Sequence, residues 1–145
     1  MLITFDRVRS FVFVDAPHEV TDYFNRWDAD RALAEVLEDP AIPYGAPTDY
    51  GRTLRLFRAR FLDSLTRKTT VIVIGDARSN YGNPEEAILA EIRDRSRRLL
   101  WLNPEPEAFW TSGDSEMRSY AGLCHEVRVC QNLNQLTDFI RDLVL

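Results

Sequence analysis

Two kinds of hydrophobic pattern alternate along the chain. Short β-branched and aromatic runs are typical of strands and occur at residues 8–15 (VRSFVFVD), 69–76 (TTVIVIGD), 99–102 (LLWL) and 125–130 (HEVRVC). Apolar residues at spacings near 3.6 predict helices from Asp28 or Asp30 to Asp39, from Thr48 or Asp49 to about Leu65, from Pro84 onward, over residues 114–123, and after Asn132. Strands that alternate with helices indicate an α/β three-layer sandwich around a mostly parallel sheet.

Two runs predict where strands lie in that sheet. Residues 18–24 (HEVTDYF) alternate between apolar and polar, and they follow the Ala16-Pro17 turn, so they predict an antiparallel edge hairpin with residues 8–15. The run VIVI at residues 71–74 does not alternate. That pattern is typical of a strand buried on both faces, so residues 69–76 are expected to form the central strand.

Composition limits the classes of function. A chain of 145 residues with 45% hydrophobic content suits a single domain over residues 1–145. Its net charge of −5 gives no general attraction to nucleic acid. Cys124 and Cys130 lack the spacing of a zinc site, and no leader-like or membrane-spanning run is present, so no membrane association is expected and a cytoplasmic location is predicted.

Candidate metal ligands follow the predicted strands. In open α/β sheets, ligands bind beyond the carboxyl ends of the strands, where Asp76 directly follows VIVIG. Thr48 offers a hydroxyl at the end of a Pro/Gly-rich loop, so Thr48 and Asp76 could hold Mg²⁺ or Mn²⁺ weakly, with water in the other positions. Two simpler interpretations stay open: Asp76 only caps the following loop, and Thr48 or Asp49 only caps the following helix.

The same loops also provide candidate partner-binding residues, namely Asp15, Asp49, Arg78, Asn80 and Tyr81. Polar, turn-prone loops on a rigid scaffold are frequent binding sites. The alternative is a small cation-dependent α/β hydrolase or phosphoryl-transfer enzyme that uses Asp76 and Asp15 as a carboxylate pair. The sequence contains no phosphate-binding glycine motif, and no motif places a serine or cysteine nucleophile beside His18 or His125. The enzyme hypothesis therefore gains no further support.

Several ordered motifs resemble the CoxE-like proteins that contain a von Willebrand factor A (VWA) domain: VRSFVFVDAPHEVTDYF, GAPTDYGRTL, TTVIVIGDARSNYGNP, RRLLWLNPEPEAFWTSGDSEMRSYAGLCHEV and NLNQLTDFIRDL. The resemblance implies a Rossmann-like, non-enzymatic protein-binding module with a metal-ion-dependent adhesion site. It also implies action beside a MoxR-type AAA+ ATPase in metalloenzyme maturation. By position, Thr48 resembles the threonine ligand of that site and Asp76 resembles its later aspartate.

The chain departs from the family pattern at its start. The family has a strand, a D-x-S-x-S metal motif and a helix before the strand that here begins near Val8, and only MLITFDR stands there. We therefore expect an N-terminally incomplete VWA-like domain with an incomplete metal site. The missing strand would lie between residues 8–15 and 69–76. Either these two strands pair directly, or a partner or a second copy completes the sheet, so a homodimer through exposed sheet edges is possible.

Overall fold

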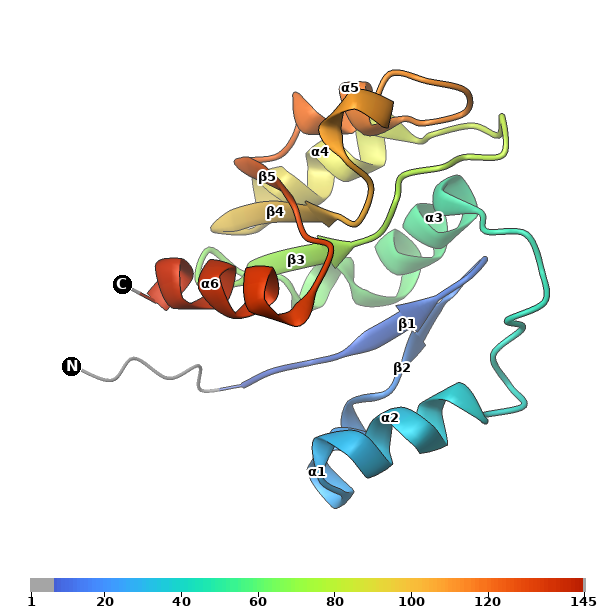
Figure 1. Ribbon diagram of the computed structural model, residues 1–145, viewed down its shortest axis with the longest axis vertical. Coiled ribbons are helices and arrows are strands. Elements are labelled where there is room, and N and C mark those ends of the chain that lie inside the picture. Colours follow the sequence, from blue (N-terminus) through green and yellow to red (C-terminus); the bar gives the residue numbers. More distant parts are fainter. Residues whose placement is uncertain (1–6, 145) are drawn as a thin grey trace.

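The structure is a computed structural model that describes residues 7–144 and contains two separate sheets (Figure 1). The strands are β1 (Phe11–Phe13), β2 (Pro17–Glu19), β3 (Thr70–Ile74), β4 (Arg98–Asn103) and β5 (Glu126–Val129). The helices are α1 (Thr21–Arg26), α2 (Ala29–Leu37), α3 (Tyr50–Phe61), α4 (Glu86–Arg95), α5 (Met117–Ala121) and α6 (Leu133–Val144), with short 3₁₀ turns η1 (Leu62–Ser64) and η2 (Glu107–Phe109).

The larger sheet confirms the predicted α/β class. Its strands follow the order β3-β4-β5, and all of them run parallel. Figure 1 shows α3 and α4 behind this sheet and α6 in front of it, which gives three layers. A small antiparallel hairpin, β1-β2, lies beside it, as the sequence predicted.

The central strand of the larger sheet is β4, and its side chains fill two cores. Leu99 and Trp101 pack with residues of α3, α4 and α5 on one face. Leu100 and Leu102 pack with Phe139 of α6 on the other face. Successive side chains of a strand point to opposite faces, so the run LLWL supplies both cores at once.

The sequence prediction that residues 69–76 form the central strand, buried on both faces, is wrong. β3 is an edge strand, because among residues 7–144 it pairs only with β4. Val71 and Val73 pack against the α3 and α4 side, but Ile72 is 39% exposed and Ile74 is 56% exposed. The physical reason is the position of α6, whose Phe139 packs over β4 rather than over β3.

The hairpin packs on α3 through aromatic side chains. The ring of Phe11 lies 5.7 Å from that of Phe57 and 4.8 Å from that of Phe61, measured between centroids, and the rings of Phe13 and Tyr50 are 5.2 Å apart. β1 forms a ladder with β2 and belongs to a different sheet from β3. Direct pairing of the strands at residues 8–15 and 69–76, one of the two expected solutions, is therefore not what the chain adopts.

The predicted second strand at residues 18–24 is also partly wrong. β2 ends at Glu19, and α1 begins at Thr21. The ladder stops where the N–H of Val20 donates to the Ser10 carbonyl (2.8 Å) and the N–H of Ser10 donates to Thr21 Oγ1 (2.9 Å). The helical turn then puts Val20 and Tyr23 on one face, where they join a small core with Val14, Val36 and Ile42.

Helix starts agree with the sequence where a side chain caps them. Asp28 accepts a hydrogen bond from the N–H of Arg31 at the start of α2 (2.9 Å), as predicted. The boundary predictions near Pro84 and over residues 114–123 were less accurate, since α4 begins at Glu86 and α5 covers only Met117–Ala121. Among residues 7–144, no helix is long and apolar enough to cross a membrane.

An ion pair between Arg9 and Glu19 (2.8 Å) stabilises the start of the hairpin, and its contribution to stability depends on pH. Hydrogen bonds from Arg9 lower the pKa of Glu19 from 4.5 to about 2. Because the pKa is depressed in the folded state, the stabilisation is present above pH 4.5 and is lost as the pH falls toward 2. We expect Arg9→Gln to raise the pKa of Glu19 toward its ordinary value, measured by NMR titration of the carboxyl carbon. The control Arg31→Gln removes the same charge from α2 and should leave that titration unchanged.

Candidate functional site

Asp76 lies two residues after the end of β3 and is held by hydrogen bonds on several sides. Its Oδ1 accepts from the Tyr50 hydroxyl (3.3 Å) and from the N–H of Arg78 (2.9 Å). Its backbone carbonyl accepts from Nδ2 of Asn103 (3.2 Å), the fully buried last residue of β4. One carboxylate oxygen thus caps the following loop, and within residues 7–144 no hydrogen bond involves the other, Oδ2.

The buried side chain of Tyr50 supports the start of the loop after β3. The side chain is only 4% exposed, and its hydroxyl also accepts a hydrogen bond from the N–H of Ala77 (3.0 Å). Burial, followed by the nearby Asp76 charge, raises the pKa of Tyr50 above its usual range, so the hydroxyl stays a neutral donor. Gly75 makes the approach possible, because a Cβ at that position would lie 2.3 Å from the Tyr50 hydroxyl oxygen.

The loop that carries Thr48 is tied to the loop that follows Asp76. Nδ2 of Asn80 donates to the Thr48 carbonyl (2.8 Å). Asp49, the residue after Thr48, caps α3 by accepting from the N–H of Arg52 (2.8 Å). The structure therefore brings the two predicted metal-ligand loops together, and it assigns the helix-cap role to Asp49 rather than to Thr48.

Residues 77–85 adopt an unusual backbone. Four non-glycine residues have left-handed φ angles: Ala77 (60°), Asn80 (51°), Tyr81 (60°) and Glu85 (52°). Conformations of this kind cost on the order of 1–3 kcal/mol each and persist only where the surroundings hold them. Here the N–H of Ser79 donates to the Asp114 carbonyl (3.1 Å) and the N–H of Asn80 donates to Asp114 Oδ2 (2.8 Å).

Arg78 points inward and joins three loops. Its guanidinium donates two hydrogen bonds to Glu105 (2.8 and 2.7 Å) and further bonds to Asp114 (3.2 Å) and to the Ser112 carbonyl (2.7 Å). The hydrogen bonds from Arg78 lower the pKa of Glu105 below its usual range. Much of this side chain's bonding capacity is therefore used within the chain, whereas the sequence had placed Arg78 among the partner-binding residues.

The other predicted partner-binding residues differ in their exposure and in the contacts that their side chains make within the chain. Tyr81 is 82% exposed, and Asn80 is exposed while it bridges the two loops. Asp15 forms an ion pair with Arg52 (3.1 Å) in the first turn of α3. Asp76 is bonded to Tyr50 in the same turn, so the two carboxylates of the alternative enzyme each have a partner of their own, and that alternative stays a prediction.

Sequence reasoning missed Tyr50, Gly75 and the acceptors of Arg78. Asn103 follows the run LLWL as Asp76 follows VIVIG, so its place at a strand end was visible in the sequence. Tyr50 had a weaker signal, a tyrosine in the first turn of a capped helix, and only the fold shows that it faces Gly75.

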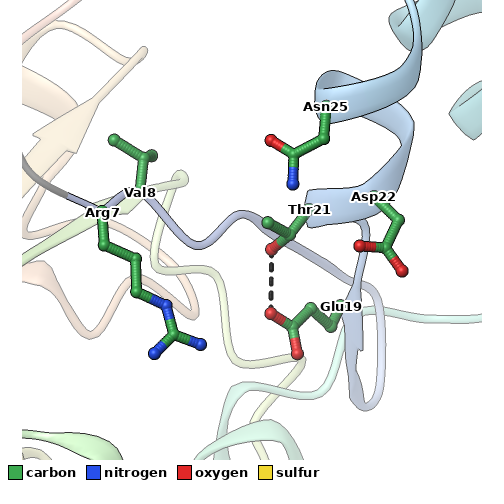
Figure 2. A pocket seen from close by; sticks show the side chains of 6 residues that line it. All are labelled: Arg7, Val8, Glu19, Thr21, Asp22 and Asn25. Carbon is green, nitrogen blue, oxygen red and sulfur yellow. Dashed lines mark hydrogen bonds between the residues drawn. The ribbon is translucent and has the colours of Figure 1, made fainter.

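Within residues 7–144, no group of three or more histidine, cysteine or acidic side chains is placed to hold a metal ion. A depression of about 530 Å³ lies at the amino-terminal end of β1, the end opposite to Asp15. Figure 2 shows the side chains around it, among which Thr21 donates to Glu19 (2.8 Å). Its lining consists of Arg7, Val8, Glu19, Thr21, Asp22 and Asn25.

The strand-end loops described above lie within a region that matches a known family. The family model for the VWA domain containing CoxE-like protein matches residues 1–139. The chain belongs to this CoxE-like VWA family. Searches of curated proteins and of solved structures gave no match. In this CoxE-like chain, Thr48 and Asp76 lie in two loops that the hydrogen bond from Asn80 to the Thr48 carbonyl joins, and their role as metal ligands stays a prediction.

The contact between Gly75 and Tyr50 can be tested by a double-mutant cycle. We expect Gly75→Ala to lower the free energy of unfolding by about 1–3 kcal/mol, because the added methyl group overlaps the buried Tyr50 hydroxyl. Tyr50→Phe removes that oxygen, so the double variant should lose less stability than the sum of the single variants. Urea denaturation measures each value. Gly45→Ala is the matched control, since a Cβ there meets no atom within 4 Å. Additive losses in the double variant would contradict the contact.

Proposed function

We propose that this chain is a non-enzymatic protein-interaction module that binds its partner through the loops at the carboxyl end of β3. Membership of the CoxE-like VWA family supports the interaction role. The family resemblance further suggests a MoxR-type AAA+ ATPase as partner, in the cytoplasm, during metalloenzyme maturation.

The observation that carries this proposal is the exposed side chain of Tyr81 on a fixed loop. The side chain is 82% exposed, yet its backbone N–H donates to Ser79 Oγ (3.1 Å), and Ser79 is itself buried. A loop fixed before binding loses little conformational freedom when the partner arrives. Tyrosine is among the residues that most often dominate the binding energy of protein interfaces, and Asn80, the preceding residue, is exposed and polar.

A divalent cation would have a subsidiary part in this module. The donors that fit it are the Thr48 hydroxyl and Oδ2 of Asp76, both oxygens of the kind that Mg²⁺ and Mn²⁺ accept. Two protein ligands leave most coordination positions to water, so the affinity is weak. When bound, the ion would add positive charge to these loops and could accept a carboxylate from the partner.

Substitution of Tyr81 tests the binding surface. We expect Tyr81→Ser to weaken binding to the MoxR-type ATPase of the same organism at least tenfold, which is about 1.4 kcal/mol, as measured by titration calorimetry. The loss follows from removal of an exposed ring whose loop stays in place. Phe24→Ser is the matched control, since it removes an exposed ring from α1, and its affinity should equal that of the wild-type chain. Unchanged affinity in Tyr81→Ser would contradict the proposed surface.

Titration with Mg²⁺ tests the cation site separately. We expect the chain alone to bind Mg²⁺ with a dissociation constant of about 1 mM or weaker. Asp76→Asn should abolish that binding while it keeps the hydrogen bonds to Tyr50 and Arg78, because an amide oxygen accepts them as well. Asp94→Asn removes the same charge on α4 and serves as the control. Micromolar affinity would contradict a weak site with two protein ligands. Binding that survives Asp76→Asn would show that the ion is held elsewhere.

A further inference from the structure

The helix α2 has an apolar face that the rest of the described chain covers only in part. Ala32 and Val36 are buried, and Val36 packs in the small core beside the hairpin. Leu33 and Leu37 each follow one of these residues, yet they are 52% and 58% exposed. Consecutive residues of a helix lie about 100° apart around its axis, so the two leucines form a second apolar stripe beside the buried one.

Exposed alanine and acidic residues surround the two leucines. Residues three and four apart on a helix are neighbours, so Leu37 lies beside both Leu33 and Ala34, which is exposed. By the same spacing, Asp30 borders Leu33 at the amino end of this surface. Glu38 borders Ala34 at the carboxyl end, and both acids are exposed. Leu33, Ala34 and Leu37 thus form an apolar patch, the α2 patch, with a carboxylate at each end. Apolar patches rimmed by polar residues are typical of protein-binding surfaces.

The α2 patch lies on an outer helix that is held at both ends. Figure 1 shows α1 and α2 on the far side of the hairpin from the larger sheet. Asp28 caps the first turn of α2 by accepting from the N–H of Arg31 (2.9 Å). The Tyr44 hydroxyl donates to the Val36 carbonyl in the last turn (2.7 Å). The surface is therefore formed before any partner arrives, and binding does not have to order this helix.

The carboxyl end of α2 lacks the cation that a helix end of this kind favours. A helix carries partial negative charge at its carboxyl end, so lysine or arginine stabilises that end and a carboxylate does not. The last turn of α2 contains no basic residue, and Glu35, Glu38 and Asp39 lie there instead. Within residues 7–144, none of these three carboxylates takes part in an ion pair. Arg31 lies near the other end of the helix, with its guanidinium carbon 4.7 Å from the Trp27 ring centroid. A cation from another molecule would therefore be favourable at this end.

We propose that the α2 patch binds a cationic amphipathic helix of a partner protein. Apolar side chains on one face of the partner helix cover Leu33 and Leu37, and a lysine or arginine beyond them lies against Glu38. A second copy of this chain fits less well, because either orientation of two α2 helices brings Glu38 of one copy against Glu38 or Asp30 of the other. The same carboxylates repel nucleic acid and anionic membranes. This surface is separate from the Tyr81 loop, so the inference does not rest on the proposed function.

A synthetic helical peptide provides the probe. We expect the fluorophore-labelled peptide KKQLAQLLAQLKK, with leucines on one helical face, to bind the full chain in fluorescence anisotropy. A peptide of the same composition in an order that breaks the leucine face should bind at least tenfold more weakly. The peptide with glutamate in place of lysine should also bind at least tenfold more weakly at low salt, and this difference should shrink at high salt.

NMR tests whether the surface is open before the peptide binds. A soluble paramagnetic reagent should broaden the methyl signals of Leu33 and Leu37 in the free chain, because both side chains are more than half exposed. We expect the peptide to protect these signals from the reagent. The methyl signals of Leu133 on α6, a residue that is 79% exposed, should stay broadened with and without the peptide.

Matched variants of the chain locate the peptide. Leu37→Gln changes an exposed side chain, so the chain keeps its fold, and we expect at least tenfold weaker peptide binding. Leu133→Gln makes the same change on α6 and should bind the peptide as the wild-type chain does. Tyr81→Ser should also bind the peptide normally, which separates this surface from the loop surface.

A charge reversal separates binding from folding. Glu38→Lys places a cation at the carboxyl end of α2, so we expect Tm to rise by about 1–3 °C. The same variant should bind the peptide at least tenfold more weakly, because cation then faces cation. Asp94→Lys reverses a charge at the carboxyl end of α4 and should leave peptide binding unchanged.

Four results would overturn the inference. The first is no peptide binding, and the second is equal binding of the glutamate peptide or of the peptide without a leucine face. The third is methyl signals of Leu33 and Leu37 that are already protected in the free chain at a monomeric mass, which would show that the chain itself covers the patch. The fourth is a dimeric mass in sedimentation that Leu37→Gln converts to a monomer, which would make a second copy the occupant.

Discussion

The burial of Tyr50 is the contact on which the rest of the arrangement depends. Its ring lies between Phe13 of the hairpin and Trp101 of β4, and it also contacts Tyr120 of α5 (6.3 Å between centroids). Its hydroxyl binds both Asp76 and the N–H of Ala77. The same side chain therefore sets the position of the hairpin relative to the larger sheet and the direction of the loop after β3. Only glycine at position 75 leaves room for it.

Local pattern was enough to predict the α/β class, the antiparallel hairpin and two helix caps, each to within a pair of residues: Asp28 or Asp30, and Thr48 or Asp49. It was not enough to place β3 in the sheet. The run VIVI is equally apolar at every position, but whether both faces are covered depends on where α6 packs, and α6 is more than fifty residues away in the sequence. The helix α1 was missed for a similar reason, because Val20 and Tyr23 gain a common core only through α2 and the loop around Ile42.

The candidate site was predictable as a set of loops but not as a set of contacts. Parallel strands end at one edge of a sheet, so Asp76 and Asn103 had to lie near each other. The direction of the Arg78 side chain could not be predicted, since it depends on Glu105 and Asp114, which come from two other loops. The left-handed backbone from Ala77 to Glu85 has no glycine signature at its strained positions, because tertiary hydrogen bonds hold it.

The lack of a shared ladder between β1 and β3 also affects rates. For the hairpin to move away from the larger sheet, the aromatic pairs of Phe11 and Phe13 with α3 must separate, and so must the hydrogen bond from the N–H of Asp49 to the Val14 carbonyl (2.8 Å) and the ion pair between Arg52 and Asp15 (3.1 Å). Both hydrogen-bond ladders stay intact in this motion. Each aromatic pair contributes about 0.5–1.5 kcal/mol beyond its buried area. Because the two ladders stay intact, this motion costs less free energy than unfolding does. Collective motions of this kind take on the order of microseconds to milliseconds. The stiffness with which the hairpin is held is therefore set by the packing of Phe11 and Phe13 on α3 and by the contacts of Val14 and Asp15 with the start of that helix.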